Sequence, residues 1–207
     1  VRNPADQSKV RHLIELASNS PGQLQLFKAD LLENGSYAKA MAGCEVVFHV
    51  ASPFTLNIKD PQKDLVDPAV AGTKSVLTSA SLTRSVKKVI LTSSCAAIYG
   101  DTADKAFVNN GVFTEQHWNT TSSLRHQPYS FSKTMAEKTA WQMANSQSRW
   151  QLIVINPSFV IGPGIISHTT SESFNLIRQL GNGRLKAGLP NVGVGAVDVR
   201  DLAEAHF

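Results

Sequence analysis

The sequence has little of what marks disulfide-stapled, membrane-spanning or nucleic-acid-binding proteins. It contains two cysteines, Cys44 and Cys95, which provide neither a disulfide framework nor the spacing of metal ligands. No apolar run approaches the roughly 18 residues that indicate a membrane-spanning helix. The net charge of +4 is spread along the chain without a run of lysine and arginine. We therefore expect no membrane or nucleic-acid partner, and the cysteine usage favours a reducing compartment, the cytoplasm.

Glycine is scarce at the start of the chain, where the first one is Gly22. The glycine pairs at 181–183 and 193–195 lack the spacing and the preceding strand of a phosphate-binding turn. The sequence as given therefore contains no glycine-rich turn of the kind that cradles a pyrophosphate.

The apolar residues that are present predict an α/β fold. Short runs rich in apolar and branched residues predict buried strands at 24–28, 46–50, 89–93 and 152–156. Longer segments of mixed polarity, 68–84 and 132–146, have the lengths of helices. Alternating strands and helices indicate a parallel, doubly wound sheet. From Pro163 onward glycine, serine and threonine cluster, and we expect a smaller lobe there.

Tyr129 and Lys133 are the most informative pair, because residues four apart share one face of a helix. A phenol titrates at about pH 10, and a fixed cation beside it favours the phenolate and lowers its pKa. Such spacing also occurs by chance on solvated helix faces. Ser94, however, follows a predicted parallel strand, and ligands of open α/β sheets bind beyond the carboxyl ends of strands. The three side chains together suggest general acid or base chemistry.

Ser94, Tyr129 and Lys133 resemble the catalytic triad of the short-chain dehydrogenase/reductase superfamily, and the chain resembles its extended, NAD-dependent epimerase/dehydratase-like branch. Its sequence motifs are most similar to those of dihydroflavonol reductases, cinnamoyl-CoA reductases and microbial aldehyde reductases. Matching stretches occur in the order of that branch at 1–4, 29–31, 47–53, 156–163 and 197–203.

The resemblance implies a Rossmann-type doubly wound sheet. Residues 1–162 would form the NAD(P)-binding domain, and residues 163–207 part of a substrate lobe interleaved with it. Members begin with a strand, a glycine-rich turn, a helix and a second strand, and Val1 resembles the end of that second strand. We therefore expect the first βα unit, roughly 30 residues or more, to be missing from this sequence, and its end at Phe207 to fall short of a complete lobe.

The resemblance also implies an activity, the reduction of a small-molecule carbonyl compound by a monomer or homodimer. Tyr129 would donate a proton to the carbonyl oxygen as a hydride leaves the nicotinamide, and Ser94 would hydrogen-bond the same oxygen. Lys133 would lower the pKa of the phenol and hold the nicotinamide ribose.

Further positions are implied to bind the cofactor. Arg2 occupies the place of a basic residue that binds the adenosine 2′-phosphate, which favours NADPH over NADH. Asp30 and Leu31 match adenine-contacting positions, although an aspartate after a strand is also an ordinary helix cap. The remaining implied residues lie at strand ends, under the pyrophosphate and ribose or beside the nicotinamide: Ala51, Ser52, Pro53, Pro157 and Ser158.

Substrate identity is only thinly encoded. Tyr99, five residues after Ser94, occupies the position at which dihydroflavonol reductases carry asparagine. Residues 124–128 lack the Asn-Trp-Tyr-Cys motif of plant cinnamoyl-CoA reductases. We therefore favour a general aldehyde or ketone reductase. A nucleotide-sugar epimerase or dehydratase and an inactive nucleotide-binding fragment or sensor remain as alternatives. His49 and His206 have no partner at ligand spacing, so we predict no metal site.

Overall fold

A three-stranded parallel sheet organises the larger part of the molecule. The computed structural model describes residues 1–52, 58–165, 171–184, 188 and 193–207. Its main sheet has the order β1-β2-β3, with β1 at Val46–His49, β2 at Lys88–Thr92 and β3 at Gln151–Ile155. Val46 lies opposite Lys88, and Lys88 lies opposite Gln151. The Rossmann-like α/β class expected from the sequence is confirmed.

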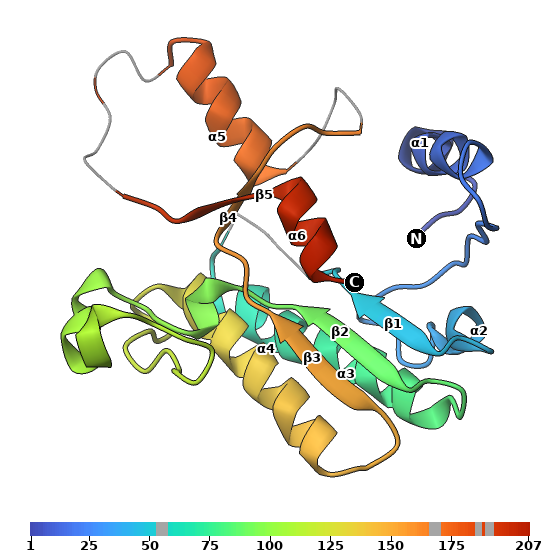
Figure 1. Ribbon diagram of the computed structural model, residues 1–207, viewed down its shortest axis with the longest axis horizontal. Coiled ribbons are helices and arrows are strands. Elements are labelled where there is room, and N and C mark those ends of the chain that lie inside the picture. The colour runs from blue at the N-terminus through green and yellow to red at the C-terminus, as the bar shows by residue number, and fades with distance from the viewer. Residues whose placement is uncertain (53–57, 166–170, 185–187, 189–192) are drawn as a thin grey trace.

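Each crossover between these strands contains a long helix, and both helices cover one face of the sheet (Figure 1). Between β1 and β2 a π-helical turn, Gln62–Val66, leads into α3, Asp67–Leu82. Between β2 and β3 lies α4, Pro128–Asn145, which begins at a proline, a residue suited to the first helical position. The helices predicted over 68–84 and 132–146 therefore exist, the second of them beginning one turn earlier than expected.

The core lies between the sheet and these two helices. Val89 and Leu91 of β2 are at most 5% exposed and pack against Val76 and Leu77 of α3. Burial of one such side chain stabilises the fold by about 1.5–3 kcal/mol. Trp150 closes one end of this core and donates its indole N–H to the Ser81 hydroxyl at 3.1 Å.

The strand predicted at 24–28 is wrong as a regular strand, because these residues form no ladder with any described part of the chain. Val1 makes two backbone bonds here: its amino group donates to the Phe27 carbonyl oxygen at 3.0 Å, and its own carbonyl accepts from the Ala29 N–H at 3.0 Å. This is the bonding pattern of one residue beside a parallel neighbour. A strand requires a longer partner than a single residue supplies.

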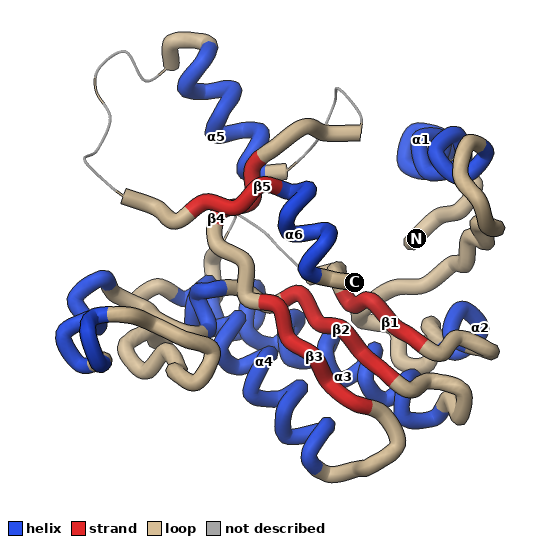
Figure 2. Tube along the Cα trace, viewed as in Figure 1, coloured by secondary structure: helices blue, strands red, loops and turns tan. Residues whose placement is uncertain are grey.

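The remaining elements lie around this sheet and are mostly short (Figure 2). The first segment holds α1, Gln7–Ser18, whose N-terminus is capped by Asp6, and α2, Ala38–Met41. After β2 come three short 3₁₀ turns, Cys95–Ala97, Thr102–Phe107 and Asn109–Gly111. The last part contains β4, Phe159–Ile161, α5, Glu172–Gly181, β5, Ala196–Asp198, and α6, Val199–Ala205.

The last part of the chain returns to the main sheet. β4 and β5 pair in parallel as a separate two-stranded sheet. After α6, the ring of Phe207 lies 5.6 Å from that of Phe48 on β1, and His206 Nε2 lies 2.7 Å from the Thr92 hydroxyl at the end of β2. Within the described part of the chain, none of the helices has the length and apolar character needed to cross a bilayer.

Candidate active site

The fold brings Ser94, Tyr129 and Lys133 together where β2 ends and α4 begins. Ser94 follows β2 and caps the Cys95–Ala97 turn, accepting the Ala96 N–H at 3.2 Å. Its side chain lies close enough to that of Tyr129, in the first turn of α4, to lower the pKa of the phenol. The Lys133 ammonium, one turn further along, lies 5.8 Å from the centre of the Tyr129 ring. A hydroxyl, a phenol and a cation therefore share one small region.

The electrostatics of Tyr129 differ from the expectation. Burial, followed by an electrostatic contribution from the neighbouring Cys95, raises the pKa of the phenol above its ordinary value, while the interaction with the Ser94 side chain lowers it less. The predicted lowering by Lys133 is therefore not seen in the free protein. The ammonium is directed elsewhere, because it donates to the Ser52 hydroxyl at 3.0 Å. Burial in turn lowers the pKa of Lys133 itself.

His49, at the end of β1, is a packed residue of this site. Its side chain is 5% exposed. Burial, assisted by the positive charge of Lys133, lowers its pKa to about 4, so the imidazole is neutral at physiological pH. Among the described residues no group of three or more histidine, cysteine, aspartate or glutamate side chains could hold a metal ion.

A cleft beyond the strand ends contains several of the predicted cofactor residues. Leu31, Ala51, Ser52 and Lys133 line it. They are joined by residues from β1, β2, α3 and α4, among them His49, Ala69, Gly72, Thr73, Thr92, Ser93 and Glu137. The site combines an apolar floor with hydroxyl and ammonium donors. These are groups that can pack against nucleoside rings and hydrogen-bond ribose or phosphate oxygens, so the residues fit a dinucleotide.

Gly72 of α3 lines this cleft next to Leu31. A Cβ at this position would lie 3.4 Å from the Cβ of Leu31, at the limit of ordinary packing. The small residue therefore lets the helix approach the segment that carries Asp30 and Leu31. The Asp30 carboxylate accepts the Leu32 N–H at 2.9 Å. This contact forms a local turn and no helix cap.

The other predicted cofactor residues are not among those that line the cleft. Arg2 is exposed near the start of the chain. Pro157 accepts the Cys95 N–H at 2.9 Å, which places it directly beside the turn that follows Ser94. Ser158 approaches Gly195, where a Cβ would come within 3.3 Å of the serine Cβ. Pro53 lies outside the described residues.

Sequence reasoning missed Glu137, which is 7% exposed and lies one turn after Lys133 on α4. Its Oε2 accepts the Ser93 hydroxyl at 2.5 Å and the Asn156 amide at 2.7 Å. Asn156 also donates to the Ser94 carbonyl oxygen at 3.1 Å. The buried carboxylate thus joins the ends of β2 and β3 to the helix that carries Tyr129. The spacing of Tyr129, Lys133 and Glu137, each four residues apart, was the available signal.

Comparison with known proteins agrees with this arrangement. Residues 5–207 match the 3-beta hydroxysteroid dehydrogenase/isomerase family. The chain belongs to this family.

Relatives within the family include the reductases that the sequence resembles. Cinnamoyl-CoA reductase CAD2 of Medicago truncatula is 40% identical over 210 residues, which cover 100% of this chain and 62% of the relative. Anthocyanidin reductase of Arabidopsis thaliana is 34% identical, with 100% of this chain and 62% of the relative covered. The chain therefore spans less than two thirds of the length of these family members.

Solved structures of family-like reductases share the fold. Yeast methylglyoxal/isovaleraldehyde reductase Gre2, complexed with NADPH, superimposes with a TM-score of 0.82 at 30% identity, covering 100% of this chain and 64% of the other. Gre2 of Candida albicans, also complexed with NADPH, gives 0.77 at 33% identity with the same coverage. The resemblance to the extended reductase branch is confirmed.

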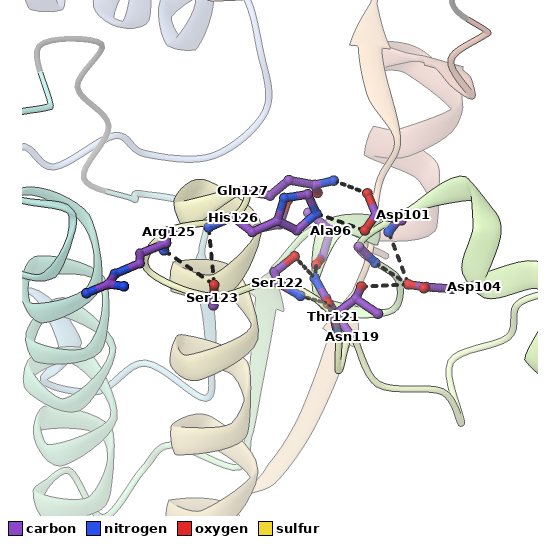
Figure 3. Close-up of polar contacts among 12 residues, drawn as sticks. Ala96, Asp101, Asp104, Asn119, Thr121, Ser122, Ser123, Arg125, His126 and Gln127 are labelled. Carbon is purple, nitrogen blue, oxygen red and sulfur yellow. Dashed lines mark hydrogen bonds and ion pairs between the residues drawn. The ribbon is translucent and has the colours of Figure 1, made fainter.

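A second polar network joins Asp101 and Asp104 to residues of the segment that precedes α4 (Figure 3). It spans the residues between the Cys95–Ala97 turn and the start of α4. The Asp104 carboxylate accepts the Thr121 hydroxyl at 2.8 Å and the N–H groups of Gly100 and Asp101 at 3.1 and 3.0 Å. Asn119, 4% exposed, donates its side-chain amide to the Ala96 carbonyl oxygen at 2.8 Å.

The aromatic ring of Tyr99 packs close to the Cys95–Ala97 turn. It stacks on Phe113 with ring centres 4.8 Å apart, and its hydroxyl lies 3.9 Å from the Cys95 sulfur. Phe113 in turn meets the His117 ring edge-on at 6.0 Å. The position singled out in the sequence as informative about substrate therefore lies in an aromatic cluster beside Ser94.

Proposed function

We propose that the protein containing this chain is an NADPH-dependent oxidoreductase that reduces an aldehyde or ketone. The observation that carries the proposal is the juxtaposition of the Ser94, Tyr129 and Lys133 side chains, with the Lys133 ammonium 5.8 Å from the centre of the Tyr129 ring. The names of two relatives support the reaction class, because cinnamoyl-CoA, methylglyoxal and isovaleraldehyde all contain a carbonyl group.

The proposed roles follow from the properties of each group. Tyr129 holds its proton at neutral pH, because burial raises the pKa of its phenol, and a protonated phenol can donate to an oxygen that gains negative charge. Ser94 supplies a second hydrogen bond to that oxygen. Bound NADPH would supply the hydride. Lys133 would hold the nicotinamide ribose from its position beside Ser52 and favour the phenolate that remains after proton transfer.

Cofactor binding is proposed for two groups of residues. Leu31, Ala51 and Ser52 line the cleft together with Lys133, and we place the nucleotide along them. Pro157 adjoins the turn after Ser94, which supports a place for it beside the nicotinamide, with Ser158 next to it. Arg2 and Asp30 stay as proposed adenosine contacts, and the guanidinium favours NADPH over NADH. Pro53 is proposed from the sequence alone.

The organisation of the chain is proposed on the same basis. Residues 1–162 would form the nucleotide-binding domain and residues 163–207 part of an interleaved substrate lobe. The pairing of Phe159–Ile161 with Ala196–Asp198 supports this interleaving, because it joins the two parts across the boundary. A small-molecule carbonyl substrate, a monomer or homodimer and a cytoplasmic location complete the proposal.

The decisive experiment is Tyr129→Phe in the full-length protein, with aldehyde-dependent NADPH oxidation and NADPH binding measured separately. We expect turnover to fall by at least about a hundredfold, the usual scale of general acid catalysis, with NADPH affinity changed little. Tyr37→Phe is the matched control, since Tyr37 packs on the core formed by α2, α3 and β2. Unchanged turnover in Tyr129→Phe would refute the mechanism. Binding of a sugar nucleotide without aldehyde-dependent oxidation would support an epimerase or dehydratase instead.

A further inference from the structure

A single carboxylate holds the two residues that precede α4 and its tyrosine. Asp101 accepts the Gln127 side-chain amide at 2.7 Å through Oδ1 and contacts His126 Nε2 at 2.8 Å through Oδ2 (Figure 3). Both oxygens of the carboxylate are therefore used on adjacent residues, 25 and 26 positions away in the sequence. Pro128 and Tyr129 follow directly.

The backbone at Gln127 adopts a conformation that its sequence does not favour. Its φ of 52° and ψ of 58° lie in the left-handed region, which a residue with a Cβ rarely occupies. Pro128 follows, and a proline disfavours the right-handed helical conformation for the residue before it, here Gln127. The Gln127 carbonyl oxygen also accepts the Phe131 N–H at 3.1 Å, a first-turn bond of α4. The conformation of Gln127 therefore sets the direction in which α4 begins.

The other end of the same loop is tied to the turn that Ser94 caps. Asn119 donates its backbone N–H to the Ala97 carbonyl oxygen at 2.8 Å and its side-chain amide to that of Ala96 at 2.8 Å. The Ala96 N–H in turn donates to Ser94 Oγ. The loop thus contacts the surroundings of both members of the Ser94 and Tyr129 pair.

We propose that Asp101 is a positioning residue that sets the distance between the Tyr129 hydroxyl and Ser94. It acts through Gln127 and His126 and does not touch the reacting atoms. The effect on turnover rests on the proposed function, whereas the effect on the start of α4 does not. Small displacements of a reacting group lower rate far more than they lower affinity, because productive geometry is narrow.

The test compares Asp101→Ala with Glu115→Ala in the full-length protein. Glu115 belongs to the same loop and loses the same charge, but it is exposed and its carboxylate makes no hydrogen bond or ion pair with the described residues. We expect Asp101→Ala to lower kcat about tenfold with the aldehyde KM and the NADPH Kd within about twofold. Asp101→Asn keeps an acceptor for the Gln127 amide and should recover most of the loss.

Amide hydrogen exchange supplies a readout that needs no turnover. The Phe131 N–H should exchange at least about tenfold faster in Asp101→Ala, because its acceptor is no longer fixed, and should be unchanged in Glu115→Ala. Unchanged exchange in Asp101→Ala, or equal losses of kcat in the two alanine variants, would overturn the proposal. If the wild-type protein oxidises no NADPH with any aldehyde, the proposed function fails, and the exchange result still decides whether Asp101 positions α4.

Discussion

His49 makes stability depend on pH in a calculable way. The imidazole is 5% exposed, and burial together with the Lys133 charge lowers its pKa from 6.5 to about 4. In the unfolded chain the same group titrates at its ordinary value. Between these two values the unfolded state binds a proton that the folded state does not. Stability is therefore unaffected by this group above pH 6.5 and falls as the pH decreases toward 4.

The size of the effect follows from the two pKa values. Their full difference corresponds to about 3 kcal/mol of unfolding free energy, since one pKa unit is worth about 1.4 kcal/mol. Most of this loss occurs before the folded state titrates, so lowering the pH from 7.5 to 5 should remove about 2 kcal/mol. This is a large share of the stability of an ordinary domain.

Urea denaturation followed by circular dichroism at pH 7.5 and pH 5 measures the change. The His49→Gln variant is the control, because it cannot titrate and the other five histidines are retained. The wild type should lose about 2 kcal/mol more than His49→Gln between the two pH values. An equal loss in both proteins would show that the buried imidazole carries no such penalty and would refute the reasoning.

Three further perturbations follow from the site. Glu137→Ala should lower the unfolding free energy by about 3 kcal/mol, measured in urea, because buried donors lose a charged acceptor; Glu137→Gln should cost less, and an equal cost would contradict the role of that acceptor. Gly100→Ala should cost about 1–3 kcal/mol, since its Cβ would overlap the Thr121 and Ser122 hydroxyls; an unchanged melting curve would contradict this. Lys133→Ala should impair both turnover and NADPH affinity, and a loss confined to turnover would reject the ribose contact.

The parts of the fold that the sequence predicts are those specified by local pattern. Continuous apolar residues marked β1, β2 and β3 within a residue or two, because parallel strands read as continuous apolar runs, although Phe48 of β1 and Ile153 of β3 are 44% and 40% exposed. The segment at 24–28 carries Gln25 and Lys28, has no β-branched residue and forms no ladder among the described residues. A strand also depends on a neighbour, and here the backbone bonds of Val1 reach only Phe27 and Ala29.

Some features of the candidate site were likewise predictable from local sequence, and others were not. The sequence by itself determined that Ser94, Tyr129 and Lys133 share one end of the sheet, because helical spacing and strand direction are local properties. Only the tertiary structure decided their electrostatics, since burial raises the Tyr129 pKa and the Lys133 ammonium donates to Ser52, 81 residues away. The contacts of the Glu137 and Asp101 carboxylates were likewise decided only by folding. Their partners come from distant parts of the chain, and only folding brings those groups within hydrogen-bonding distance.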